Sequence, residues 1–197
     1  MTTEYIKVMS QGNLQENNSK FIVNTGSSTA FVEDLKFSHS YDRFISQFLS
    51  SYFNSPVEVV EDLERQKQGI DFIVKQNPEI KVDLKLYRKD SGKLYLEKYT
   101  DRRSSKLGWL EAPASKTDLY IFFMPTTQRL ILASKPVLIN MVKTIEEMKP
   151  DDLFSFYRFN GNSWGSYYAV PIDTFKMVRG KYLFQEIDLR QLYGGAD

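Results

Sequence analysis

The segment "DFIVKQNPEIKVDLKLY", residues 71 to 87, decides the fold because it predicts two short β-strands that carry charged residues among apolar ones. A turn signal, Asn77-Pro78, separates the first strand (69 to 75) from the second (80 to 87). Successive side chains of a strand point to opposite faces. The second strand therefore has an apolar face and a polar face, made respectively of Ile80, Val82, Leu84 and Leu86, and of Lys81, Asp83, Lys85 and Tyr87.

The first strand places a further acid on the polar side. Its apolar face holds Ile70, Phe72 and Val74, which leaves Asp71 on the opposite face. Antiparallel pairing across the turn would bring Asp71 beside Asp83, with Lys85 next to them.

Two carboxylates at short range repel unless a positive charge lies between them, so this pattern predicts a divalent cation. Mg²⁺ prefers a few hard oxygen ligands and keeps several waters, and the main-chain carbonyl of Leu84 is a further candidate ligand beside Asp71 and Asp83. A lysine beside the ion can position a water and ease the loss of its proton. This is chemistry for phosphodiester hydrolysis. The alternative is a solvated sheet face with an ordinary salt bridge worth about 1 kcal/mol or less.

Acid-x-Lys triplets occur four times, and position decides between them; they begin at Asp34, Glu79, Asp83 and Glu147. Only the Asp83 triplet lies on a strand that follows another acid-bearing strand. Glu79 shares the face of Asp83 and is a rival or supplementary ligand at the mouth of the strand. Asp42, on an expected helix, is read as a surface acid paired with Arg43 or a lysine, with the metal as the alternative partner. His39, the only histidine, is expected at the helix entry.

Periodicity predicts the elements around this segment. A helix is expected over 41 to 53 after a cap at Ser38 or Ser40, a strand over 57 to 64, and further strands over 93 to 100, 118 to 124 and 129 to 133. Pro136 opens a second helix that ends at Lys149-Pro150, and Asn160-Gly161 signals a hairpin. Residues 11 to 30 read as a loop or arm.

Composition indicates a single ordered domain of 197 residues, 42% hydrophobic and free of cysteine. We expect an N-terminal arm (1–38), a core (39–148) and an aromatic-rich extension (149–197). The absence of cysteine excludes disulfides and zinc–thiolate sites and fits a reducing compartment. The start lacks a signal-peptide pattern, and no run reaches the roughly 18 apolar residues of a membrane span. These features favour a cytoplasmic protein without a membrane partner.

Positive charge is concentrated around the opening segment. Residues 65 to 106 contain 12 Lys and Arg against 6 Asp and Glu, although the whole chain has a net charge of only +1. Such a distribution suits a phosphate-rich partner, and Arg102, Arg103 and Lys106 are the candidates for phosphate contact. The alternative is a solvated lysine-rich face.

Taken together, these residues resemble the PD-(D/E)xK nuclease superfamily, which has the restriction-endonuclease-like fold. Gly69-Ile70-Asp71 is similar to its first metal-ligand strand, Asp83-Leu84-Lys85 to its D/ExK strand, and the helix 41 to 53 to its opening helix. The resemblance implies an α/β fold with a central mixed β-sheet flanked by helices in the order αβββ-αβ. It also implies that Asp71 and Asp83 ligate Mg²⁺ or Mn²⁺, that Lys85 acts on the attacking water, and that Glu64 supplies an additional acid.

The function expected from this resemblance is that of a metal-dependent DNA endonuclease acting on double-stranded DNA. Two alternatives remain open: a nuclease-fold protein that has lost catalysis and binds DNA or protein, and an unrelated α+β protein of a phage or mobile element whose acids are structural. The oligomeric state also stays open, although double-strand cleavage by so small a domain calls for two active sites, as a homodimer would supply.

Overall fold

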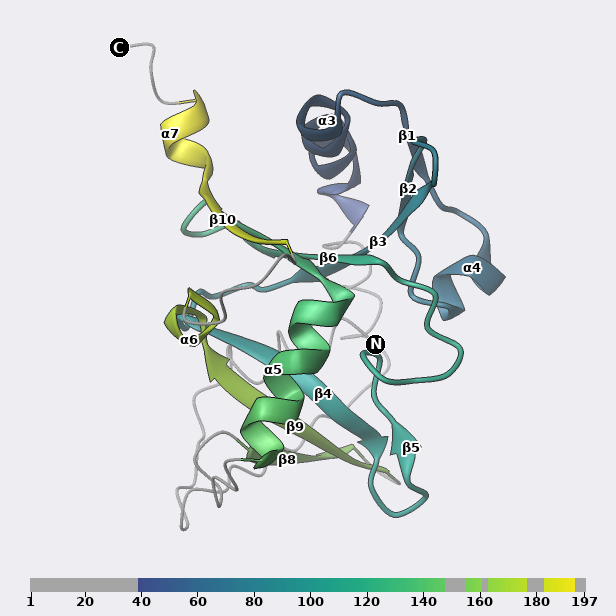
Figure 1. Ribbon diagram of the computed structural model, residues 1–197, viewed down its shortest axis with the longest axis vertical. Coiled ribbons are helices and arrows are strands. Elements are labelled where there is room, and N and C mark those ends of the chain that lie inside the picture. Colours follow the sequence, from purple (N-terminus) through teal and green to yellow (C-terminus); the bar gives the residue numbers. More distant parts are fainter. Residues whose placement is uncertain (1–38, 148–154, 161–162, 177–182, 194–197) are drawn as a thin grey trace.

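A computed structural model of the protein describes residues 39–147, 155–160, 163–176 and 183–193, and within them the chain forms two β-sheets with helices around them (Figure 1). One sheet has six strands in the order β1-β2-β3-β6-β7-β10, and the other has four in the order β5-β4-β9-β8. The expectations for residues 11 to 30, Ser38, Asp34 and Lys149-Pro150 lie outside the described residues.

The six-stranded sheet is mixed. Its strands are β1 (Val57–Val59), β2 (Phe72–Val74), β3 (Ile80–Leu86), β6 (Leu119–Met124), β7 (Arg129–Ser134) and β10 (Phe184–Asp188). Strands β3 and β6 pair in parallel, whereas the other neighbours pair antiparallel. The expected mixed α+β class, with a mixed sheet flanked by helices, is therefore confirmed.

The four-stranded sheet contains β4 (Lys93–Asp101), β5 (Lys106–Leu107), β8 (Ser155–Asn160) and β9 (Ser163–Pro171). Strands β8 and β9 pair antiparallel, so the predicted hairpin is confirmed, although Asn160 is opposite Ser163 as the last paired residue of β8 rather than part of the turn. The predicted strand 93 to 100 exists but belongs to this second sheet. As a result, the connection from β3 to its parallel neighbour β6 runs through β4 and β5 rather than through a helix, which departs from the expected αβββ-αβ order.

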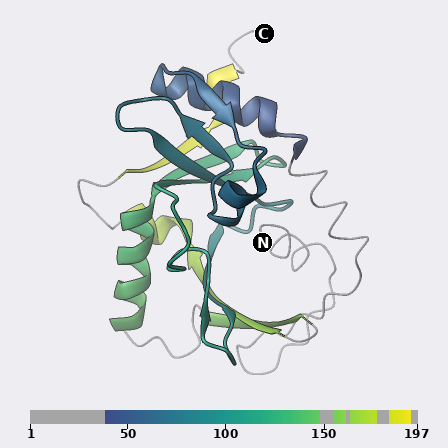
Figure 2. The ribbon, with the colours of Figure 1, turned by 90° about the vertical axis from the view of Figure 1, so that its right-hand side faces the viewer.

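The helices cover both faces of the six-stranded sheet (Figure 2). Helix α3 (Asp42–Phe53) and the short α7 (Leu189–Tyr193) lie on one side, and α5 (Lys135–Glu147) lies on the other with the four-stranded sheet and α6 (Ile172–Lys176). The helical spacing read from the sequence is confirmed, because α3 buries Ile45, Phe48 and Leu49, and α5 buries Val137, Leu138, Met141, Val142 and Ile145. The α3 N-cap is Tyr41, without a side-chain cap.

The strand expected over 57 to 64 is wrong beyond Val59. The side chain of Asp62 accepts a hydrogen bond from the backbone N–H of Arg65 at 2.9 Å and caps a short helix, α4 (Leu63–Lys67). Asp is a favoured N-cap residue, so the local capping contact takes over where the strand pattern ends. Glu64 consequently lies in the first turn of α4 and not at the end of a strand.

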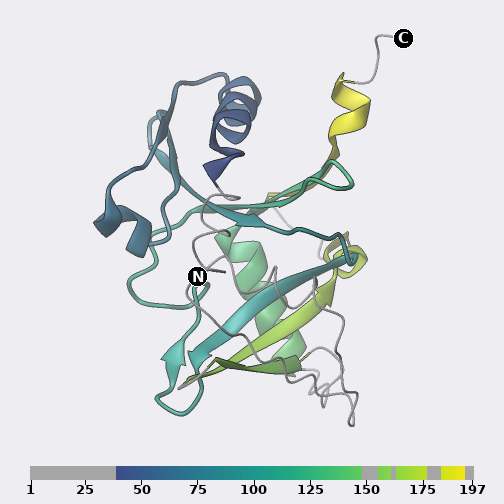
Figure 3. The same cartoon turned by 180° about the vertical axis from the view of Figure 1, so that it is seen from behind.

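Among the described residues, this layering gives two large hydrophobic cores, beside a small cluster of Val60, Ile70 and Ile73. One lies between α3 and the six-stranded sheet, and the other is enclosed by that sheet, α5 and the four-stranded sheet (Figure 3). All six residues of β6 are buried because both faces of the strand are covered, as expected for the interior of such a sheet. None of the helices described is long and apolar enough to cross a membrane.

Candidate functional site

Asp83 and Lys85 project from β3 into the core between the two sheets. The parallel register of β3 with β6 pairs Asp83 with Tyr120 and Lys85 with Phe122, on the face opposite α3. Asp83 is 3% exposed and Lys85 is 6% exposed. The alternation predicted for this strand is confirmed, and the alternative of a solvated sheet face is wrong at these two positions.

Asp71 meets Asp83 at the point where β2 begins. The register of β2 with β3 pairs Phe72 with Val82, so Asp71 and Asp83 occupy the next opposed positions. The carboxylate of Asp71 accepts the backbone N–H of Leu84 at 2.8 Å, and it lies close enough to Asp83 for the two charges to repel each other. The structure thus brings the two predicted acids together, while their role as metal ligands stays a prediction.

Lys85 forms a buried ion pair with Asp83. Its Nζ lies 2.7 Å from Oδ1 and 2.8 Å from Oδ2 of Asp83, so both carboxylate oxygens are engaged. The same Nζ lies 4.8 Å from the centroid of the Trp109 ring and 6.0 Å from that of Tyr120. A cation over an aromatic face is attracted by the ring quadrupole. The Lys85 ammonium is therefore stabilised both by the Asp83 carboxylate and by the rings of Trp109 and Tyr120.

The environment changes the acidity of both aspartates. Loss of hydration, together with the negative charge of Asp83, raises the pKa of Asp71 to about 7, although Lys85 and the Leu84 N–H act in the opposite direction. Burial also raises the pKa of Asp83, against the pull of Lys85. Since Lys85 pairs directly with Asp83, we assign the shared proton near neutral pH to Asp71.

The backbone beside the acids depends on a glycine. Gly69 has a φ of +75°, and a Cβ at this position would lie 2.9 Å from Oγ1 of Thr117 and 3.2 Å from Oδ2 of Asp83. The Thr117 hydroxyl donates to the Gly69 carbonyl at 2.6 Å and fixes this approach. The chain can therefore pass directly against the Asp83 carboxylate only because no side chain is present.

A third buried acid, Glu97 on β4, faces the site from the four-stranded sheet. It is 4% exposed and accepts hydrogen bonds from the Trp109 N–H (3.1 Å), the Tyr167 hydroxyl (3.2 Å) and the Thr100 hydroxyl (3.3 Å). Burial raises the pKa of Glu97, while these donors and the charge of Lys85 oppose the shift. Sequence reasoning missed Glu97, although an acid within the apolar run "LYLEKY" is the same kind of signal that singled out Asp83.

The other candidate residues lie apart from this site. Glu64 is exposed and pairs with Lys67 at 2.6 Å, and Glu79 pairs with Lys75 at 3.0 Å. Asp42 contacts His39 at 2.7 Å, and its charge adds slightly to the raised pKa of Asp71. The phosphate-contact candidates are exposed around the turn between β4 and β5; they are Arg102, Arg103 and Lys106.

The site offers a divalent cation two carboxylates and one carbonyl oxygen. Among the described residues, no group of three or more His, Cys, Asp or Glu side chains is placed to hold a metal ion. Mg²⁺, however, is commonly bound through only one or two carboxylates. Asp71 and Asp83 supply these, and the Leu84 carbonyl points to the same edge of β3 as the N–H that Asp71 accepts, because both groups of one strand residue face the same side.

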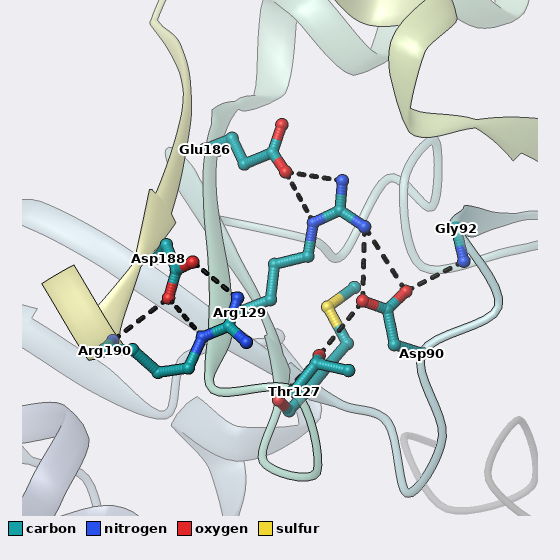
Figure 4. Close-up of polar contacts among 8 residues, drawn as sticks. Asp90, Gly92, Thr127, Arg129, Glu186, Asp188 and Arg190 are labelled. Atoms are coloured by element: carbon teal, nitrogen blue, oxygen red, sulfur yellow. Dashed lines mark hydrogen bonds and ion pairs between the residues drawn. The ribbon is translucent and has the colours of Figure 1, made fainter.

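A second polar cluster lines a pocket of about 250 Å³ at the end of β7 and β10 (Figure 4). Arg129 joins Glu186, at 2.5 Å, to Asp90, at 3.2 Å. Arg190 pairs with Asp188 at 2.6 Å. These contacts tie the turn after β3 to β7 and to the C-terminal strand, and they give the cluster a structural role.

Comparison with protein-family models, with curated proteins and with solved structures gave no match.

Proposed function

We propose that the protein is a metal-dependent DNA endonuclease with a restriction-endonuclease-like core. The observation that carries this proposal is the placement of Asp71 and Asp83 at opposed positions of adjacent strands, with the Lys85 ammonium paired with Asp83 in a buried site. Helix α3 followed by the antiparallel strands β1, β2 and β3 also supports the core. The chain differs from the expected order at α4, which lies between β1 and β2, and at the hairpin β4–β5, which stands in place of a helix before β6.

In this proposal, the residues of the site have separate roles in metal binding and in hydrolysis. Asp71 and Asp83 would hold Mg²⁺ or Mn²⁺ with help from the Leu84 carbonyl, and Lys85 would orient the attacking water and ease the loss of its proton. The ion, when bound, stabilises negative charge that develops on the phosphate. Trp109 and Tyr120 shield the Lys85 side of the site from bulk water, which strengthens each of these electrostatic contacts.

A protein with this fold that binds DNA without cutting it is the second candidate. It is favoured by the small number of ligands, since only two carboxylates meet at the site, and by the tight Asp83–Lys85 ion pair that occupies both oxygens of Asp83. Such a protein would bind DNA without a metal and leave it intact.

Incubation with supercoiled plasmid and with single-stranded circular DNA, with and without Mn²⁺, tests the proposal. We expect Mn²⁺-dependent nicking or linearisation, lowered at least about 100-fold in Asp83→Asn and in Lys85→Met. These near-isosteric changes are preferable to alanine because the amide oxygen introduced by Asp83→Asn can still accept a hydrogen bond from the Lys85 ammonium, which an alanine side chain cannot.

Glu146→Gln is the matched control, because this acid lies on the surface of α5 and pairs with Lys98. It should cut as the wild type does. Cleavage that persists in a chelator, or an Asp83→Asn protein of wild-type activity, would remove the assignment. Retention of DNA in a gel shift without any cleavage would instead select the binding protein.

A further inference from the structure

The hydrogen bonds of Glu97 suit an ionised carboxylate. All three of its partners, Trp109 N–H, Tyr167 OH and Thr100 OH, can donate to its oxygens. These donors and the charge of Lys85 favour the ionised form, whereas burial favours the protonated one. Burying such a charge is unfavourable unless a cation compensates it, so the position of Glu97 calls for a nearby positive group.

Lys85 is that positive group, and it lies between two acids. Its ammonium touches Asp83 on one side and rests against the Trp109 ring on the other. The main-chain N–H of the same tryptophan holds Glu97. The charge of Lys85 is close enough to favour the ionised form of Glu97. Trp109 therefore lies between Asp83 and Glu97, and the Lys85 ammonium interacts electrostatically with both carboxylates.

Asp83 cannot hold Lys85 with both carboxylate oxygens and also ligate a divalent cation. Both of its oxygens are held by the ammonium, and an ion ligated at about 2 Å would take over one of them. The two positive charges would then repel each other strongly in a buried site. An ammonium that leaves its carboxylate while still buried needs a second carboxylate.

We propose that Glu97 is the positioning residue that receives Lys85 when Asp71 and Asp83 take up a divalent cation. This inference rests on the proposed function, because it presupposes that the site binds a metal. The Lys85 side chain would move across the face of Trp109, where contact with the ring stabilises the charge along the way. After the move, Glu97 balances the charge of Lys85 and the oxygens of Asp83 are free to act as ligands; the ammonium would have to stay within hydrogen-bond reach of the water that the proposed function has it orient.

A double-mutant cycle on Mn²⁺ affinity, measured by calorimetry, tests this transfer. Glu97→Gln keeps an acceptor for Trp109 and removes only the charge, so Lys85 stays on Asp83 and Mn²⁺ binding weakens at least about tenfold. The Lys85→Met protein has no ammonium for Glu97 to receive. Adding Glu97→Gln to it should therefore change the Mn²⁺ affinity less than about twofold. Glu146→Gln controls for the loss of one negative charge and should bind as the wild type does.

Equal weakening by Glu97→Gln in both backgrounds would show a general attraction for cations; it would overturn this inference and leave the proposed function standing. A wild-type protein that binds no Mn²⁺ would overturn both.

Trp109 offers a readout that does not depend on a Glu97 variant. The chain has two tryptophans, so Trp164→Phe leaves Trp109 as the sole indole. Movement of the ammonium across its ring should alter the emission on titration with Mg²⁺, and Lys85→Met should abolish this change. Emission that stays constant while calorimetry records Mg²⁺ binding would overturn the movement of Lys85.

Discussion

Asp71 is the residue at which the candidate site lowers the stability of the fold at neutral and higher pH. Its carboxyl group lies against Asp83, and burial together with that charge raises its pKa to about 7. The folded protein therefore binds a proton that the unfolded chain, with an ordinary pKa near 3.8, has already released. Stability from this group is fully present below pH 3.8 and is lost as the pH rises through about 7. Such a cost at a polar cluster is expected where function requires two acids together.

We expect Asp71→Asn to raise the free energy of unfolding at pH 8, by on the order of 2 kcal/mol. The amide oxygen can still accept the Leu84 N–H, and the neutral amide removes the repulsion from the Asp83 charge. Urea denaturation between pH 4 and pH 8 measures the effect. The wild type should lose stability across this window, while Asp71→Asn should lose much less.

Glu79→Gln, at an exposed acid paired with Lys75, is the control and should keep the pH dependence of the wild type. Parallel pH curves for Asp71→Asn and the wild type would contradict the assignment of the proton to Asp71.

At the scale of elements, the site depends on close contact between the segment after β5 and strand β4. Gly108 lies so near Glu97 that a Cβ would fall 2.2 Å from the Glu97 carbonyl oxygen, while the Gly108 N–H donates to the Lys98 carbonyl at 2.8 Å. The contact is with backbone, so no rotamer change can relieve it. Trp109, next in the chain, owes its position beside Lys85 to this approach.

Gly108→Ala should therefore destabilise the protein by about 3 kcal/mol and weaken the near-ultraviolet circular dichroism of the tryptophan region. Gly92→Ala is the matched control, since its Cβ would meet nothing within 4 Å and only its φ of +67° is unfavourable. The control should cost about 1 kcal/mol. Equal costs for the two substitutions, measured by urea denaturation, would show that the segment can move away from β4.

The sequence alone predicts the part of the site that lies on the hairpin of β2 and β3. Alternation along β3 and a single turn at Asn77-Pro78 determine which side chains face the same way, and these local rules placed Asp71, Asp83 and Lys85 correctly. The expected position of Glu64 at the end of a strand is wrong, because Asp62 caps helix α4 there, and this capping signal is present in the sequence.

Glu97 could not be placed in the same way, because its position depends on a contact between sheets. Its strand was expected to follow β3 in one order of elements, whereas β4 pairs with β9 in the second sheet. The register of β4 with β9 also shifts between Glu97 and Tyr99, and such bulges re-aim side chains. Long-range packing of this kind leaves no short-range pattern in the sequence.

At the scale of the whole molecule, Arg129 links strand β10 to the segment that follows β3, the strand that carries Asp83 and Lys85. It binds Glu186 of β10 and Asp90 in the turn after β3 (Figure 4). Burial alone would raise the pKa of Asp90, but hydrogen bonds from the Gly92 N–H and from Arg129 hold it below its ordinary value. This contribution to stability is present above pH 3.8 and is lost as the pH falls through the lowered pKa, opposite in sign to that of Asp71.

Arg129→Met should lower the stability by about 1 to 2 kcal/mol at pH 7, reduce hydrogen-exchange protection in β10, and flatten the loss of stability below pH 4. Arg190→Met is the matched control, because Arg190 is exposed and pairs only two residues away, with Asp188. It should leave the protection of β10 unchanged. Equal loss of protection in both variants would argue that the pocket as a whole, rather than the Arg129 bridge, holds this strand.

Under the proposed function, we expect the basic turn between β4 and β5 to be the surface through which the whole molecule meets DNA. Arg102, Arg103 and Lys106 are exposed there, and only a few residues separate them from Trp109 at the site. Each phosphate contact contributes about 0.9 to the slope of log affinity against log salt concentration. Substitution of all three by alanine should weaken DNA binding and lower this slope by up to about 3.

Because these side chains would position the DNA and not the reacting groups, the triple variant should raise KM for cleavage more than it lowers kcat. Lys143→Ala, at an exposed lysine on α5, controls for the loss of a positive charge elsewhere and should change neither quantity appreciably. Filter binding from 50 to 300 mM salt, with cleavage kinetics on the same DNA, gives both readouts. An unchanged slope would assign the basic residues of 65 to 106 to a solvated face and place the DNA contacts elsewhere on the molecule.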